Sequence, residues 1–86
     1  MSNNAVRMYG DSTCPYCGAA RMLLARKGVS FEDISVVDPT VRREMQDLSG
    51  RHTVPQIFIG ETHVGGFDDL CALDKSGELD TLLGTD

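Results

Sequence analysis

Residues 12–18 read STCPYCG and place two cysteines, Cys14 and Cys17, around a proline and a tyrosine. Proline suits the first position of a helix, because its missing N–H would have no partner there anyway. The stretch therefore predicts a turn that ends at Cys14 and a helix that begins at Pro15. In this arrangement the first sulfur faces outward, and the second lies one turn inside the helix.

The position of the pair favours redox chemistry between two thiols of unequal reactivity. The unpaired N–H groups of Tyr16 and Cys17 are expected to point toward the Cys14 sulfur, where the helix dipole adds positive potential. Both effects favour the thiolate, and in such settings a cysteine pKa can fall from about 8.5 to roughly 3.5–7.5. Cys17 faces the core and is expected to keep its proton until it reacts. The pattern is typical of a nucleophile followed by a resolving thiol.

A metal clip is the main alternative interpretation of a CxxC pair. A structural zinc site needs four ligands, usually a second CxxC pair or two closely spaced histidines. The remaining candidates are scattered along the chain and are Cys71, His52 and His63. We therefore expect no metal site. A pair of inert buried thiols is also disfavoured, because Cys14 lies at a turn.

Composition excludes several other classes of protein. The 86 residues suit one small domain, residues 1–86, with the hydrophobic content of 41% that is usual for a soluble globule. A net charge of -5 argues against nucleic acid as a partner. The apolar stretches are too short to span a bilayer, and the first ten residues lack the apolar centre of a secretory signal. We expect a cytoplasmic protein, in which a CxxC pair indicates metal or redox chemistry rather than a structural disulfide.

Periodicity and breaker residues predict an α/β fold with a mixed four-stranded sheet flanked by helices. The expected strands are residues 5–9, 29–37, 56–59 and 62–64, and the expected helices are residues 15–27, 38–49 and 67–74. The order is β-α-β-α-β-β-α, followed by a last helical turn or two over residues 78–83. Strands joined by a helix are expected to run parallel, and the last two strands to form an antiparallel hairpin.

Three segments in register resemble the glutaredoxin family over nearly the whole chain. They are TCPYC at 13–17, TVPQIFI at 53–59 and GGFDDL at 65–70. Their order and spacing are similar to those of dithiol members of the CPYC type, especially the short bacterial glutaredoxins. The resemblance implies a thioredoxin fold, with glutathione as a co-substrate and no permanently bound cofactor.

The same resemblance implies a role for each motif. Cys14 would be the nucleophile and Cys17 the resolving cysteine, with glutathione held by Tyr16, Arg42, Thr53, Val54, Pro55, Gly66, Phe67 and Asp68. Pro55 is expected to follow a cis peptide bond, with the Val54 backbone paired to the ligand. The start of the third helix would receive the γ-glutamyl carboxylate, and Asp68 its ammonium group. Arg42 would reach the glycine carboxylate, although a solvated helix face explains this arginine equally well.

Two functions of different classes remain open. The first is a glutathione-dependent oxidoreductase that reduces protein–glutathione mixed disulfides and protein disulfides, working as a monomer. The alternative is an iron–sulfur carrier, in which two subunits share a cluster through one cysteine each and two glutathiones. Pro15 disfavours the carrier because it stiffens the loop, and an absorbance spectrum after anaerobic reconstitution would distinguish the two. A redoxin that depends on thioredoxin reductase is disfavoured by the groove expected around Val54 and Gly66.

The chain also departs from the family at two positions. Asp11 stands where many relatives carry a lysine, so we expect Cys14 to be less acidic here than in those relatives. Phe67 stands where relatives often have cysteine or serine. Outside these motifs, we expect His52 and His63 to be surface residues without a specific partner, and Cys71 to be half-buried on the third helix.

Overall fold

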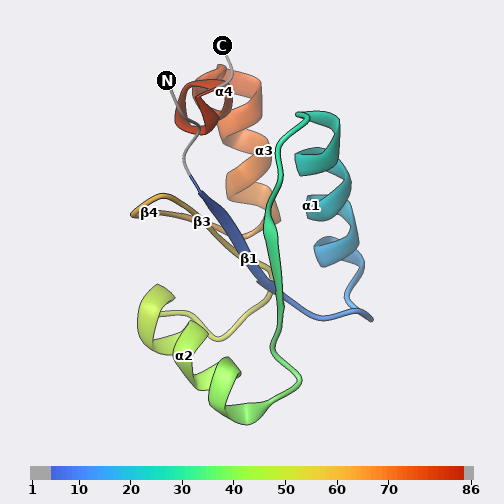
Figure 1. Ribbon diagram of the computed structural model, residues 1–86, viewed down its shortest axis with the longest axis vertical. Coiled ribbons are helices and arrows are strands. Elements are labelled where there is room, and N and C mark those ends of the chain that lie inside the picture. Colours follow the sequence, from blue (N-terminus) through green and yellow to red (C-terminus); the bar gives the residue numbers. More distant parts are fainter. Residues whose placement is uncertain (1–4, 85–86) are drawn as a thin grey trace.

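The computed structural model describes residues 5–84, which form eight elements in chain order (Figure 1). The strands are β1 (Val6–Gly10), β2 (Glu32–Ser35), β3 (Gln56–Ile59) and β4 (Thr62–Gly65). The helices are α1 (Pro15–Arg26), α2 (Pro39–Ser49), α3 (Phe67–Ser76) and α4 (Glu78–Leu83). The predicted order is confirmed, and the last helical turns form the separate helix α4.

The four strands make one mixed sheet in the order β2-β1-β3-β4. β1 pairs parallel to β2, with Met8 opposite Asp33, and β3 forms the predicted antiparallel hairpin with β4. The prediction that strands joined by a helix run parallel is wrong for β2 and β3, because β3 pairs antiparallel to β1. The crossover rule concerns strands that run parallel in one sheet. Because β1 lies between β2 and β3, these two strands do not pair with each other, and the rule does not set the direction of β3.

Helices cover both faces of the sheet, with α1 and α3 on one side and α2 on the other (Figure 1). Successive residues of β1 point to opposite faces, so Val6 and Met8 enter one hydrophobic cluster and Tyr9 enters the other. The larger cluster includes buried leucines of α1, α3 and α4. The smaller one comprises Tyr9, Val36, Met45 and Phe58.

Local chemistry sets the limits of α1 as predicted. Its buried face includes Cys17, as predicted, together with Ala20, Leu23 and Leu24. The helix ends at Arg26, one residue before the predicted end. Lys27 forms the C-cap, and its ammonium pairs with Asp74 at 2.6 Å and Asp80 at 3.1 Å. This contact connects the end of α1 to α3 and α4.

The segment between α1 and α2 contains a shorter strand than predicted. β2 covers only Glu32–Ser35, the residues that pair with Arg7–Gly10 of β1. The flanking side chains still pack inward, Val29 and Phe31 against the larger cluster and Val36 in the smaller. α2 begins as predicted, since the Asp38 carboxylate accepts a hydrogen bond from the Thr40 N–H at 2.8 Å.

Candidate active site

The two cysteines of the CxxC pair occupy different environments at the start of α1. Cys14 is the N-cap residue and is half-buried, whereas the Cys17 side chain is fully buried. The Cys14 sulfur lies 4.0 Å from the carbonyl oxygen of Val54. The Val54–Pro55 peptide bond is cis, as predicted. The fold therefore places the proline segment directly beside Cys14.

The environment of Cys14 favours its thiolate. Burial raises the pKa of Cys14, but hydrogen bonds from the Cys17 backbone, the Cys17 thiol and the Tyr16 backbone outweigh this effect, and the pKa lies below its ordinary value. The two backbone donors are the groups that the sequence predicts. The Asp11 carboxylate acts in the opposite direction and raises the pKa of Cys14.

Cys17 is held in its protonated form. Burial raises the pKa of Cys17 to about 11, and the neighbouring Cys14 raises it as well. The Asp11 backbone N–H donates to the Cys17 sulfur at 3.4 Å, which opposes this shift only in part. The pair thus has an accessible sulfur whose ionisation is favoured and a buried one whose ionisation is disfavoured.

The charge of Asp11 is partly compensated by groups around it. Its carboxylate accepts hydrogen bonds from the Thr13 N–H and hydroxyl, each at 2.9 Å. Arg21 donates to the Asp11 carbonyl at 3.4 Å and pairs with Asp33 at 2.7 Å. Sequence reasoning missed Arg21, although its i,i+4 spacing from Cys17 on one helix was an available signal.

A cavity of about 280 Å³ opens next to Cys14, on the side of Tyr16 and Val54. Its lining includes seven of the eight residues predicted to hold glutathione, namely Tyr16, Thr53, Val54, Pro55, Gly66, Phe67 and Asp68. The rings of Tyr16 and Phe67 lie 6.2 Å apart and form an aromatic wall. Residues distant in sequence therefore meet at one site, as predicted, although their contact with glutathione stays a prediction.

Arg42 is the predicted ligand residue that does not line this cavity. It is half-buried on α2, and its charge contributes to a lowered pKa of Asp11, behind the larger effect of the Thr13 hydrogen bonds. Two residues that sequence reasoning missed, Arg51 and Asp69, line the cavity instead.

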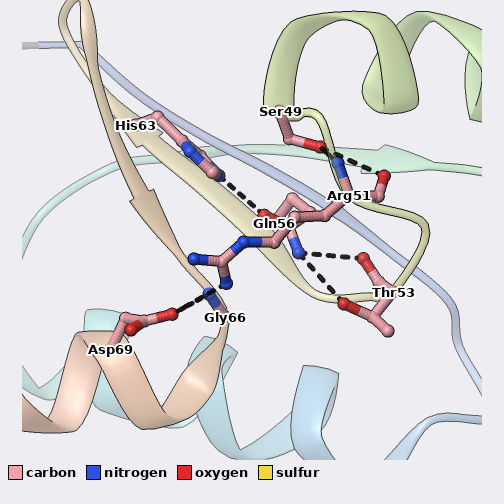
Figure 2. Close-up of polar contacts among 7 residues, drawn as sticks. All are labelled: Ser49, Arg51, Thr53, Gln56, His63, Gly66 and Asp69. Carbon is pink, nitrogen blue, oxygen red and sulfur yellow. Dashed lines mark hydrogen bonds and ion pairs between the residues drawn. The ribbon is translucent and has the colours of Figure 1, made fainter.

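Arg51 and Asp69 join the two sides of the cavity (Figure 2). The Arg51 guanidinium donates to the Asp69 carboxylate at 3.1 Å, and the same oxygen accepts from the Gly66 N–H at 3.0 Å. The Ser49 hydroxyl accepts from the Arg51 N–H at 3.0 Å and donates to its carbonyl at 3.2 Å. These contacts fix Arg51 at both its backbone and its guanidinium.

His63 has a specific partner, so its prediction as an ordinary surface residue is wrong. Its Nε2 lies 2.7 Å from the side-chain oxygen of Gln56, which is fully buried (Figure 2). The Gln56 amide nitrogen donates to the Thr53 carbonyl at 3.0 Å and to its hydroxyl at 3.3 Å. The amide oxygen is therefore the acceptor, and Nε2 of His63 carries the proton. Burial and the charge of Arg51 lower the pKa of His63, which favours this neutral form.

The other residues outside the motifs lie where they were expected. His52 is exposed, and Cys71 is half-buried against the larger cluster. Within residues 5–84, no group of three or more His, Cys, Asp or Glu side chains is arranged to hold a metal ion. No helix in that range combines the length and apolar character needed to cross a membrane.

Comparisons with known proteins agree with this geometry. The glutaredoxin family profile matches residues 6–64. Relatives include a glutaredoxin of Pseudomonas aeruginosa and Glutaredoxin 3 of Escherichia coli K12, each 53% identical over 79 residues. Both matches cover 91% of this chain, with 94% and 95% of the respective relatives.

Two solved structures extend the comparison to the fold. The glutaredoxin from Brucella melitensis matches with a TM-score of 0.87 and 53% identity, over 99% of this chain and 94% of its own. A buckwheat glutaredoxin–glutathione complex matches with a TM-score of 0.87 and 25% identity, over 94% and 77%. These matches confirm the predicted thioredoxin fold. The chain belongs to the glutaredoxin family of thiol–disulfide oxidoreductases.

Proposed function

We propose that this protein is a glutathione-dependent oxidoreductase in which Cys14 is the nucleophile and Cys17 the resolving thiol. The unequal ionisation of the two sulfurs carries the proposal: the pKa of Cys14 is lowered, while that of Cys17 is raised to about 11. The adjacent cavity supports glutathione as the co-substrate, because its size is near the lower end for small-molecule sites. The similarity to a glutaredoxin described as a glutathione complex supports the same choice.

In the proposed reaction with a glutathionylated protein, the Cys14 thiolate attacks the glutathione sulfur. A Cys14–glutathione disulfide forms, the substrate disulfide breaks, and the substrate leaves as a thiolate that takes a proton from solvent. A second glutathione thiolate then attacks the bound glutathione sulfur and releases glutathione disulfide and the Cys14 thiolate. Each exchange breaks one S–S bond and forms another. Over the cycle one mixed disulfide and one free glutathione are converted to the substrate thiol and glutathione disulfide.

Protein disulfides require the second cysteine. Cys14 first forms a mixed disulfide with one substrate sulfur and releases the other. Cys17 then loses its proton and attacks the Cys14 sulfur, which frees the second substrate thiolate and leaves a Cys14–Cys17 disulfide. Two glutathiones reduce this bond and leave as glutathione disulfide. Burial is the main cause of the high pKa of Cys17, and the smaller part that comes from the Cys14 charge is removed once Cys14 is in a disulfide.

Serine variants of the three cysteines test these roles. Cys17→Ser should retain reduction of mixed disulfides and lose reduction of protein disulfides, whereas Cys14→Ser should lose both. Cys71→Ser is the matched control and should retain both, because Cys71 packs against the core from α3. The assay couples glutathione to glutathione reductase and NADPH, and thioredoxin with its reductase replaces this pair in parallel. Robust turnover by Cys14→Ser, or equal turnover with either reductant, would refute the proposal.

A further inference from the structure

We propose that Arg21 is a positioning residue for the resolving step, in which Cys17 attacks the mixed disulfide of Cys14. Arg21 acts on the Cys17 sulfur through its positive charge and through the backbone of Asp11. The inference rests on the proposed function and adds to it a residue outside the cavity. It starts from the position of Arg21 on α1, one helical turn after Cys17 and within reach of Asp11.

The Asp11 backbone connects Arg21 to both cysteines. Its carbonyl accepts hydrogen bonds from the Arg21 guanidinium and from the Cys14 N–H, each at 3.4 Å. Its N–H donates to the Cys17 sulfur, also at 3.4 Å. The N–H and the carbonyl belong to the two rigid peptide units that meet at one Cα atom. A guanidinium that holds the carbonyl therefore also restricts where the N–H lies at the sulfur.

Arg21 is itself held by β2. Its Nε donates to one carboxylate oxygen of Asp33 at 2.7 Å, and its Nη2 donates to the other at 3.4 Å. The ion pair is partly exposed, at 28% of the arginine side chain and 41% of the aspartate, so it contributes little to stability by itself. The fork of five N–H donors can meet this carboxylate and the Asp11 carbonyl together. The guanidinium is thus fixed between β2 and the turn before α1.

The resolving step needs a negative charge that the environment of Cys17 disfavours. The Cys17 thiol gives its proton to solvent and its thiolate attacks the Cys14 sulfur. The Cys14–Cys17 bond forms, and the substrate leaves as a thiolate. Burial raises the pKa of Cys17 and opposes this ionisation, whereas the Asp11 N–H and the charge of Arg21 lower that pKa. The charge of Arg21 also interacts more strongly with Cys17 than with Cys14. A cation at this position is therefore worth more to the resolving step than to the first attack.

The test measures the two steps separately in a Cys71→Ser background, where Cys14 and Cys17 are the only cysteines. Reduced protein is mixed with glutathione disulfide, quenched with acid at set times and weighed by mass spectrometry. Loss of the reduced form gives the rate of the Cys14 attack. Conversion of the glutathionylated form to the intramolecular disulfide gives the resolving rate. A second measurement titrates the thiolate absorbance of Cys17 after Cys14→Ser is added, which leaves Cys17 as the only cysteine.

Four variants separate the charge of Arg21 from its part in joining α1 to β2. Arg21→Gln removes the cation, whereas Arg21→Lys keeps it together with a donor for the Asp11 carbonyl. Asp33→Asn breaks the same ion pair but keeps the cation and removes a negative charge instead. Arg26→Gln is the matched control, because Arg26 is an exposed cation in the last turn of the same helix.

Arg21→Gln should slow the resolving step about threefold, because a roughly tenfold smaller thiolate fraction is partly offset by the higher nucleophilicity of a more basic thiolate. The Cys14 attack should change less, and the pKa of Cys17 should rise. Arg21→Lys should recover most of the lost rate. Asp33→Asn should resolve at least as fast as the parent, and Arg26→Gln should match it.

An unchanged resolving rate or an unchanged Cys17 pKa in Arg21→Gln would overturn the inference. Equal slowing by Arg21→Gln and Asp33→Asn, or equal slowing of both steps, would indicate a structural role and overturn it as well. A parent whose glutathionylated form yields no intramolecular disulfide would refute the proposed function together with the inference. A parent that resolves normally beside an equally fast Arg21→Gln would refute the inference alone.

Discussion

Gly10 and Gly18 allow a direct test of how the buried cysteine is packed. A methyl group added at Gly10 would lie 3.1 Å from both the Cys17 sulfur and the Met8 methyl carbon, closer than an ordinary carbon contact. Cys17 and Met8 are fully buried, so neither can move into solvent. At Gly18, on the same helix as Cys17, an added methyl meets nothing within 4 Å.

The expected effects have opposite signs. Overpacking a core costs about 1–3 kcal/mol, and replacing glycine by alanine regains about 0.5–1 kcal/mol of backbone entropy. Gly10→Ala should therefore lower the free energy of unfolding by about 0–2.5 kcal/mol, with about 1 kcal/mol expected at the middle of the two ranges. Gly18→Ala should raise it by about 0.5–1 kcal/mol, because glycine disfavours a helix interior.

Urea denaturation of the reduced proteins, followed by circular dichroism, measures both changes on one scale. Gly10→Ala should also slow protein-disulfide reduction more than mixed-disulfide reduction, because the added methyl presses on the resolving sulfur and not on Cys14. If Gly10→Ala is as stable as the parent while Gly18→Ala shows its gain, the packing described around Cys17 is incorrect.

Two further predictions concern charged groups. Asp11→Asn should lower the pKa of Cys14, and Asp11→Lys should lower it further, most clearly at low ionic strength. A thiol titration measures this series, and an unchanged pKa in both variants would contradict it. The pKa of Asp69 is lowered, first by the Gly66 N–H and then by Arg51, so the charged form stabilises the fold. This stabilisation is present above the ordinary pKa of 3.8 and is lost as the pH falls through the lower folded value, whereas Asp69→Asn should lack that part of the acid sensitivity. Identical pH profiles of melting temperature for the two proteins would show that Asp69 makes no such contribution.

Helix limits were predictable where a residue acts on its own backbone neighbours. Pro15 begins α1, and Asp38 caps α2 through the Thr40 N–H two residues away. The same local reasoning anticipated the backbone donors around the Cys14 sulfur. It was less accurate for β2, because an edge strand extends only as far as its pairing with its one neighbour, here β1.

The candidate site was predictable to the extent that short motifs carry it. The motifs supplied seven lining residues of the cavity, but they gave no reason to choose Arg51 over Arg42. Both are arginines near the middle of the chain, and charge alone does not indicate which way a side chain extends. Gln56 offered a weak signal, as a polar residue in an otherwise apolar strand, but its partner His63 lies on another strand.

The sequence by itself determined the order of the elements and the backbone donors to the Cys14 sulfur, because Pro15 begins the helix directly after this residue. The raised pKa of Cys17 depends on the assembled core, since burial is its main cause. Only the tertiary structure decided that β3 runs antiparallel to β1 and that Arg51 reaches Asp69, 18 residues away. Such contacts depend on how separate elements pack, since a side chain far along the chain is brought near only when both clusters form. The backbone donors to Cys14 are thus local in origin, whereas the burial of Cys17 and the charge pattern of the cavity are properties of the assembled fold.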